Sequence, residues 1–247
     1  MLKRLVQSTL SVFGVRLARL DSNAPPAYGL DAFFPLLKRY GFDPAHVIDV
    51  GANHGNWTRA AAKYFPKAHY TLVEPQDNLK IYVQDLVDRG IDIRWINAGA
   101  SDRSGVLTLH VDRRDQSSTF MEVSRTVDRA IRRVDVPVKT VNEIVASSSL
   151  PIPEMVKIDA EGFDLKVIDG AADLFGKTDV FLAEVSLGQR DFETTALAVI
   201  QKMADAGYRF IDITDLNRSP KFGVLWLCEF AFLRNSSTLL DAAANYE

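Results

Sequence analysis

Short apolar runs alternate with helix-like segments through most of this chain. Strand-like runs are expected near 47, at 70–73, 93–98, 155–158 and 180–184. Helical patterns are expected at 30–40, from about 56 to 65, at 77–89, from 163, and from about 192 to 206. Strands that alternate with helices in this way are typical of a mostly parallel sheet with helices on both faces. The pattern therefore predicts an α/β fold.

Two regions depart from this alternation. Strand-like runs at 106–111 and 134–138 flank an arginine-rich polar stretch, which predicts a β-rich insertion at about 106–140 that would cover a site. Towards the end, 208–213 and 222–233 are strand-like and are joined by a turn rather than a helix. We therefore expect the sheet to finish in an antiparallel hairpin.

Residues 1–28 form a separate segment, because Pro25 and Pro26 break it from the rest of the chain. Apolar residues recur at helical spacing from Leu2 to Leu17, and no acid opposes the basic residues before Asp21. This predicts an amphipathic helix. Three roles are open to it: packing on the domain, peripheral contact with a membrane, or mitochondrial targeting. Residues 29–247 are expected to form a single domain.

Composition narrows the class of protein. The chain has 247 residues, of which 47% are hydrophobic and 25% charged, as in ordinary globular proteins. A formal net charge of −3 provides no global basic field, so nucleic acid is not an expected partner. No apolar run approaches the length of a membrane span. The lone Cys228 lies in an apolar run and is expected to pack as a small hydrophobe, which favours a cytoplasmic location.

The strongest chemical signal follows the run at 47–50. Gly51 and Gly55 form a turn before a helix-like segment, and the next apolar run ends on Glu74. Glu74 follows Gly55 by about 20 residues, the spacing at which an acid accepts hydrogen bonds from a ribose. Glycines at such a turn let the backbone approach the ligand. The layout predicts a site for the adenosine part of a cofactor; a tight turn with an incidental acid is the alternative without function.

The turn also distinguishes between adenosine cofactors. Nicotinamide and flavin enzymes use G-x-G-x-x-G, whose second glycine lets the backbone approach a pyrophosphate. Asn53 occupies that position here and obstructs the approach. S-adenosylmethionine has no pyrophosphate, and an antiparallel terminal hairpin suits a methyltransferase sheet better than a dehydrogenase one. We therefore expect S-adenosylmethionine as the cofactor.

Four blocks of sequence resemble the FkbM-type S-adenosylmethionine-dependent methyltransferases. They are 49–55, 74–75, 97–102 and 156–164. The last block is the most telling, because Lys157 to Gly162 is closely similar to the "KIDVEG" signature of that family. Leu182-Ala183-Glu184 also matches the family pattern, and Gly99 is a small departure from it. The resemblance covers roughly residues 46 to 190.

The resemblance implies a class I methyltransferase fold: a three-layer, Rossmann-like sandwich with a mostly parallel seven-stranded sheet. It also implies methyl transfer to oxygen. The residues that would border the methionine end of the cofactor are Asp49, Gly51, Ala52, Asn53 and Gly55. Glu74, with Pro75 beside it, would hold the ribose. Ala100 and Ser101 would flank the adenine, and Asp102 would either reach the adenine amino group or stabilise the turn.

Three acids at strand ends are the candidate catalytic residues: Asp159, Glu161 and Glu184. The reaction needs in-line alignment and a base for the acceptor hydroxyl. Lys157 alternates with Asp159 and Glu161, so an extended strand would place all three on one face, where the lysine would keep a neighbouring carboxylate ionised. The alternative is that Glu161 simply favours the dipole of the following helix, as Asp164 would.

A metal ion is not predicted. Asp159 and Glu184 would nevertheless suffice, with waters, to bind Mg²⁺ beside the acceptor. The expected partner is a small-molecule, saccharide or lipid-linked acceptor with a hydroxyl group, such as a sugar, glycolipid or secondary metabolite. A nucleic-acid or other small-molecule methyltransferase and a non-catalytic binding protein are the alternatives, and a homodimer stays open. Arginines between 113 and 133 would bind an anionic acceptor or solvate a helix face.

Overall fold

The computed structural model describes residues 28–114, 117–122, 130–188 and 194–239. The amphipathic helix predicted within residues 1–28 lies outside the described residues, apart from Tyr28. Within these ranges, no helix combines the length and apolar character needed to cross a membrane.

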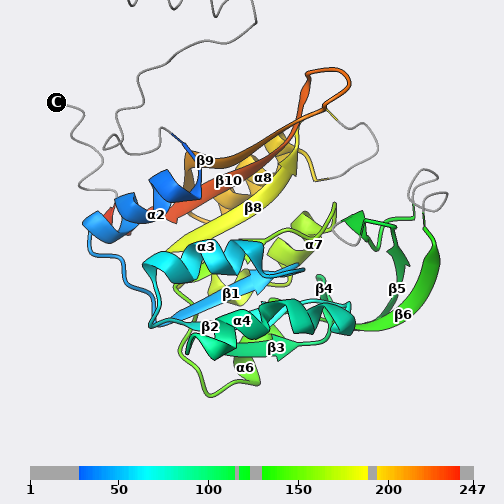
Figure 1. Cartoon of the computed structure of the whole chain (residues 1–247). Helices are drawn as coiled ribbons and strands as arrows, with labels where there is room; N and C mark the ends of the chain where they lie inside the picture. The colour runs from blue at the N-terminus through cyan, green and yellow to red at the C-terminus, as the bar shows by residue number, and fades with distance from the viewer. Residues whose placement is uncertain (1–27, 115–116, 123–129, 189–193, 240–247) are drawn as a thin grey trace, which may run out of the picture.

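A seven-stranded sheet, ordered β3-β2-β1-β7-β8-β10-β9, runs through the molecule (Figure 1). Its strands are β1 (His46–Val50), β2 (His69–Val73), β3 (Asp92–Ile96), β7 (Met155–Ile158), β8 (Val180–Ser186), β9 (Tyr208–Arg218) and β10 (Leu225–Arg234). The first five strands in this order pair in parallel, and β10 pairs antiparallel with both β8 and β9. The predicted mostly parallel sheet with an antiparallel terminal hairpin is confirmed.

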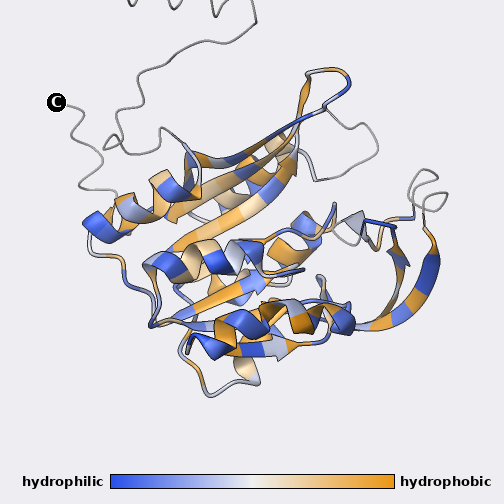
Figure 2. Cartoon of the chain, in the orientation of Figure 1, coloured by the Kyte–Doolittle hydropathy of each residue, from blue (hydrophilic) through white to orange (hydrophobic). Residues whose placement is uncertain are grey.

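Helices cover both faces of this sheet. One face packs against α2 (Leu30–Arg39), α3 (Asn56–Tyr64) and α4 (Gln84–Asp88), and the other against α6 (Val141–Ala146), α7 (Asp164–Asp169) and α8 (Ala196–Asp205). Successive β1 residues Val47 and Ile48 belong to the two different cores, and all of β1 is buried. Burial on both faces explains why the central strands are continuous apolar runs, as Figure 2 shows for β1 and β8.

Two predicted helices differ from the structure. The helix expected at 77–89 is a 3₁₀ helix, η1 (Asp77–Val83), followed by the short α4. At the junction the Arg59 guanidinium donates to the Tyr82 carbonyl, which in an α-helix would accept from the backbone four residues on. The helix expected from about 192 begins at Ala196, because the Thr195 hydroxyl caps it by accepting from the Ala198 amide.

A second, three-stranded sheet lies past the carboxyl ends of β1 and β3 (Figure 1). It contains β4 (Gly99–Ala100), β5 (Gly105–Val111) and β6 (Arg132–Lys139), with β6 in the middle. The strand expected at 93–98 therefore ends early, and the chain moves into this sheet. Polar and apolar residues alternate along β6 (Figure 2), because only its inner face packs on the small core around Leu109.

A glycine at the end of α7 lies against the second sheet. Gly170, which ends α7, accepts a hydrogen bond at its carbonyl from the Asn142 amide. A Cβ added to Gly170 would lie 2.1 Å from the Ser101 carbonyl oxygen, at the end of β4. No side chain fits between them without moving one of the two backbones.

We expect Gly170→Ala to lower the free energy of unfolding by about 1–3 kcal/mol, the usual cost of overpacking. Gly105→Ala is the matched control, because a Cβ there meets nothing within 4 Å. It should change stability by less than about 0.5 kcal/mol. Urea unfolding of both variants measures the difference, and equal effects would show that the contact with Ser101 is not the constraint.

Candidate functional site

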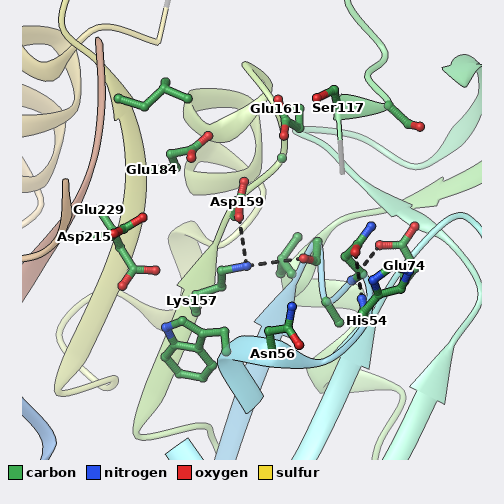
Figure 3. Close-up of a pocket in the computed structure, with 18 of the residues that line it drawn as sticks. His54, Asn56, Glu74, Ser117, Lys157, Asp159, Glu161, Glu184, Asp215 and Glu229 are labelled. Atoms are coloured by element: carbon green, nitrogen blue, oxygen red, sulfur yellow. Dashed lines mark hydrogen bonds and ion pairs between the residues drawn. The ribbon is translucent and has the colours of Figure 1, made fainter. Parts of the chain in front are cut away.

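A cavity of about 990 Å³ opens at the carboxyl ends of β1, β2, β7 and β8 and along β9 and β10 (Figure 3). Ligands of doubly wound sheets bind at these strand ends. The volume is at the upper end of the range for ligand pockets, roughly 300–1,000 Å³. The cavity is therefore large enough to hold a cofactor and part of a second molecule.

The glycine turn after β1 forms one wall. Gly51 has φ +73°, and its amide donates to the Val73 carbonyl at the end of β2. A Cβ on Gly51 would lie 1.8 Å from the Asp159 carbonyl oxygen. Glycine is thus required here both by the left-handed backbone and by the close approach of the chain after β7.

Glu74 directly follows β2 and has a geometry that fits a ribose. One carboxylate oxygen accepts from the Asn53 amide at 2.9 Å, and the other accepts from the Gln76 amide at 3.0 Å. The oxygen that accepts from the Gln76 backbone also accepts from the Gln76 side-chain amide at 3.5 Å, whereas the oxygen that accepts from Asn53 keeps a second lone pair for a hydroxyl group of a ligand. Burial raises the pKa of Glu74 to about 6, against the two amide hydrogen bonds that favour the charged form. The residues present fit the adenosine half of S-adenosylmethionine.

The other residues predicted to bind the cofactor fall into two groups. Ala52, Asn53, Pro75 and Ala100 line the cavity together with Gly51 and Glu74. The cavity lining does not include Asp49, Gly55, Ser101 or Asp102. Gly55 faces Val83, which a Cβ would approach to 2.5 Å. The Ser101 hydroxyl donates to Asp102, whose pKa is lowered by that bond, so this pair stabilises its own turn.

Asp49 acts below the cavity floor. It is fully buried in β1 and accepts a hydrogen bond of 2.6 Å from the Thr58 hydroxyl of α3. The Lys157 ammonium lies 3.3 Å from Asp49, 3.3 Å from Asp159 and 3.3 Å from the Gly51 carbonyl. Lys157 therefore joins the ends of β1 and β7 at the centre of the site.

Lys157 is only 4% exposed yet charged. Burial works against its charge, but the carboxylates of Asp159, Asp49 and Glu229 outweigh burial and raise its pKa above the usual lysine range. Lys157 was predicted to lie beside a carboxylate, and in the structure it forms ion pairs with both Asp49 and Asp159.

The three candidate catalytic acids converge on the cavity. One oxygen each from Asp159, Glu161 and Glu184 lies within 4.8 Å of the other two. Glu161 does not reach the cavity by the predicted alternation along an extended strand, because β7 ends at Ile158 and Glu161 has φ +48°. This left-handed turn, strained for a glutamate, turns its side chain into the cavity. The Thr119 hydroxyl donates to the Glu161 carbonyl at 2.7 Å and thereby ties residues 117–120 over the site.

Crowding of carboxylates changes their protonation. Burial, then the negative charges of Asp159 and Asp164, raises the pKa of Glu161 well above its usual value. Burial, then Asp159 and Glu161, does the same for Glu184. A carboxylate with a raised pKa is suited to accept a proton near neutral pH. The same three oxygens are ligands of the kind that Mg²⁺ prefers.

Asp164 has a structural role. It begins α7, and its two carboxylate oxygens accept from the Ala160 and Gly162 amides at 2.8 and 3.1 Å. These bonds shape the turn that carries Glu161. Burial raises the pKa of Asp164 to about 6.

Comparison with known proteins decides the family. The model of the methyltransferase FkbM domain matches residues 49–210, more than half of the chain. The chain belongs to the FkbM methyltransferase family. The predicted family, and with it S-adenosylmethionine as the cofactor and the methyltransferase class of enzyme, is confirmed. No curated protein sequence matches the chain.

Solved methyltransferase structures resemble the chain at low sequence identity. Precorrin-6y C5,15-methyltransferase from Geobacter metallireducens is 12% identical, with a TM-score of 0.46, over 83% of this chain and 87% of that one. The 1,6-didemethyltoxoflavin-N1-methyltransferase of Burkholderia thailandensis, solved with S-adenosylhomocysteine, is 12% identical with a TM-score of 0.46, over 81% and 75%. At these identities the similarity concerns the fold alone. The sheet order identifies the class I methyltransferase fold.

The sequence patterns did not predict the part of the cavity that β9 and β10 form. Cavity residues there are Thr214, Asp215, Asn217, Trp226, Leu227 and Glu229. Glu229 is 8% exposed and accepts a hydrogen bond of 2.5 Å from the Thr214 hydroxyl, and burial raises its pKa to about 7. An acid inside the apolar run 222–233 was the one available signal, because a buried strand rarely contains a charge without a reason.

Replacing Lys157 by methionine should lower the free energy of unfolding by about 3–5 kcal/mol, since it leaves Asp49 buried and unpaired. Lys202→Met removes an exposed ion pair with Asp169 and should cost at most about 1 kcal/mol. Urea titrations of the two variants provide the comparison. A Lys157→Met protein as stable as Lys202→Met would contradict a central role for the buried ammonium.

Proposed function

We propose that this protein transfers the methyl group of S-adenosylmethionine to a hydroxyl oxygen of a sugar, glycolipid or secondary metabolite. One observation carries the proposal: the Glu74 end of the cavity and the Asp159, Glu161 and Glu184 cluster open into the same space, with Lys157 between them (Figure 3). A nucleophile held in line with the methyl group gains on the order of 7–11 kcal/mol from orientation alone.

The cofactor half of the site would work by positioning. S-adenosylmethionine supplies an activated methyl group when bound. Glu74 would accept hydrogen bonds from the ribose hydroxyls, and the turn from Gly51 to Asn53 would border the methionine end. The acidic wall of Asp159, Glu161 and Glu184 favours a positively charged sulfonium beside it.

The acid cluster would remove the proton of the acceptor. Asp159 follows directly after β7 and is held by Lys157, so its oxygens are fixed at the junction of the two halves. The raised pKa values of Glu161 and Glu184 suit them to receive or relay that proton. Since these acids suffice as bases, Mg²⁺ is not required by this scheme, although Asp159, Glu161 and Glu184 would be its ligands.

Charge around the cavity favours a small acceptor over nucleic acid. Arg114, one of the arginines between 113 and 133, lines the cavity. The cavity lining contains more carboxylates than cations. A polyanionic backbone would meet repulsion there. The free, buried thiol of Cys228 supports a cytoplasmic setting, where thiols stay reduced.

Glu74→Gln should weaken binding of S-adenosylhomocysteine about 10- to 100-fold, because a charge-assisted hydrogen bond is worth about 1.5–3 kcal/mol. Calorimetry measures this directly. Asp102→Asn, off the cavity, is the control and should bind as the wild type does. The wild-type affinity should also fall as the pH drops below about 6, where Glu74 gains a proton, while the Glu74→Gln affinity stays flat. Unchanged affinity in Glu74→Gln would remove Glu74 from the cofactor site.

Asp159→Asn should retain affinity for S-adenosylhomocysteine but lose about 10²–10⁴-fold in turnover, the usual contribution of a positioned base. Radiolabelled methyl transfer into sugar and lipid extracts of the source cell is the measurement. Asp169→Asn, which alters an exposed ion pair with Lys202, should leave turnover unchanged. Full activity in Asp159→Asn would exclude this carboxylate from the reaction.

A further inference from the structure

We infer that the β9–β10 hairpin forms the acceptor subsite, in which Trp226 is the platform for a polyhydroxylated ring without negative charge, and Asp215 and Asn217 bind its hydroxyls. The inference rests on the proposed function, because it assumes that the Glu74 end of the cavity holds the methyl donor.

Opposite ends of the cavity belong to different parts of the fold. In Figure 3, Glu74 and His54 lie on one side, Glu184, Asp215 and Glu229 lie on the other, and Asp159 lies between them. In-line transfer requires the nucleophile to approach the methyl group from the side away from its leaving group. A donor bound at Glu74 therefore directs the acceptor towards the hairpin.

Two β-bulges turn hairpin side chains into the cavity. Leu225 pairs with Arg218 and Leu227 pairs with Asn217, so Trp226 is an extra residue in β10. Likewise Glu229 pairs with Asp215 and Phe230 with Ile213, so Thr214 is an extra residue in β9. Both extra residues line the cavity. Bulges beside active sites re-aim side chains in this way, so the irregular register itself points to a binding surface.

The side chains here combine an aromatic face with polar groups set in place. Trp226 lines the cavity and is still 39% exposed, which leaves a broad apolar surface for a ring. The Asn217 amide donates to Asp215 at 2.9 Å, and this bond holds both side chains in one orientation. The second Asp215 oxygen and the Asn217 carbonyl have lone pairs for hydroxyl donors. An aromatic wall with a few oriented polar groups is typical of small-molecule sites.

Charge limits the acceptor further. Glu184, Asp215 and Glu229 lie together at this end, and the nearest buried cation, Lys157, is already paired with Asp49 and Asp159. A phosphate or carboxylate on the acceptor would therefore meet uncompensated negative charge. Hydroxyl groups, which donate to carboxylates, match the surface.

The test follows the indole signal of Trp226 by NMR in full-length protein saturated with S-adenosylhomocysteine. The probes are methyl glycosides of common hexoses and deoxyhexoses, each paired with its sugar phosphate where one exists. At least one neutral glycoside should shift the Trp226 signal and leave that of Trp95, in β3, unchanged. The phosphorylated partner should bind at least tenfold more weakly.

Variants connect the signal to the subsite. Trp226→Ala and Asp215→Ala should each weaken glycoside binding at least tenfold, with an unchanged affinity for S-adenosylhomocysteine; calorimetry measures both, because Trp226→Ala lacks the indole signal. Phe222→Ala is the matched control, because Phe222 is 71% exposed on the same hairpin and does not line the cavity. It should bind the glycoside as the wild type does.

Three results would overturn the inference: no glycoside reaching Trp226, tighter binding of the sugar phosphate, or glycoside binding that survives Trp226→Ala. Each can occur with S-adenosylhomocysteine bound, in which case the proposed function stands. If S-adenosylhomocysteine itself does not bind, the proposed function fails, and the acceptor inference fails with it.

Discussion

The contact of the Lys157 ammonium with Asp49, Asp159 and the Gly51 carbonyl is the interaction on which the site depends. It lies inside a parallel sheet, where an unpaired charge would be prohibitively costly. Because its partners are on β1 and just beyond β7, the ion pair sets the relative position of the glycine turn and Asp159. One side chain, which itself lines the cavity, thus holds the glycine turn and Asp159 in place.

The carboxylates around this ammonium depend on it in turn. Asp159, Glu161 and Glu184 crowd together with raised pKa values at the two glutamates, and Glu161 occupies a left-handed conformation that its side chain disfavours. Such an arrangement costs stability, and the surrounding structure must hold it in place. Three hydrogen bonds hold this turn in place. The Ala160 and Gly162 amides donate to the Asp164 carboxylate, and the Thr119 hydroxyl donates to the Glu161 carbonyl. Residues far apart in sequence thereby maintain one strained turn.

Local pattern predicted the parts of the site that lie at regular strand ends. Gly51, Glu74 and Asp159 directly follow buried strands, Glu184 lies near the end of β8, and two strand-like runs without a helix between them indicate the terminal hairpin. The hairpin's contribution was not predictable, because a bulge such as that at Trp226 depends on the pairing register of two strands and not on either alone. The division of the helix expected at 77–89 into η1 and α4 was not predictable either, because Arg59, which bonds to the Tyr82 carbonyl at the junction, belongs to another element.

Gly99 has a consequence for how relatives of this chain can differ. A Cβ at this position would lie 2.5 Å from the Phe120 ring, which also packs against Phe163 with ring centroids 5.6 Å apart. The Phe120 ring therefore occupies the space that a side chain at position 99 would need. In a homologue with a larger residue at 99, the aromatic ring at 120 must shrink or move, and the segment over the cavity moves with it. Positions 99 and 120 should therefore covary among relatives, and the residue pair found there should indicate how residues 117–120 are placed over the cavity.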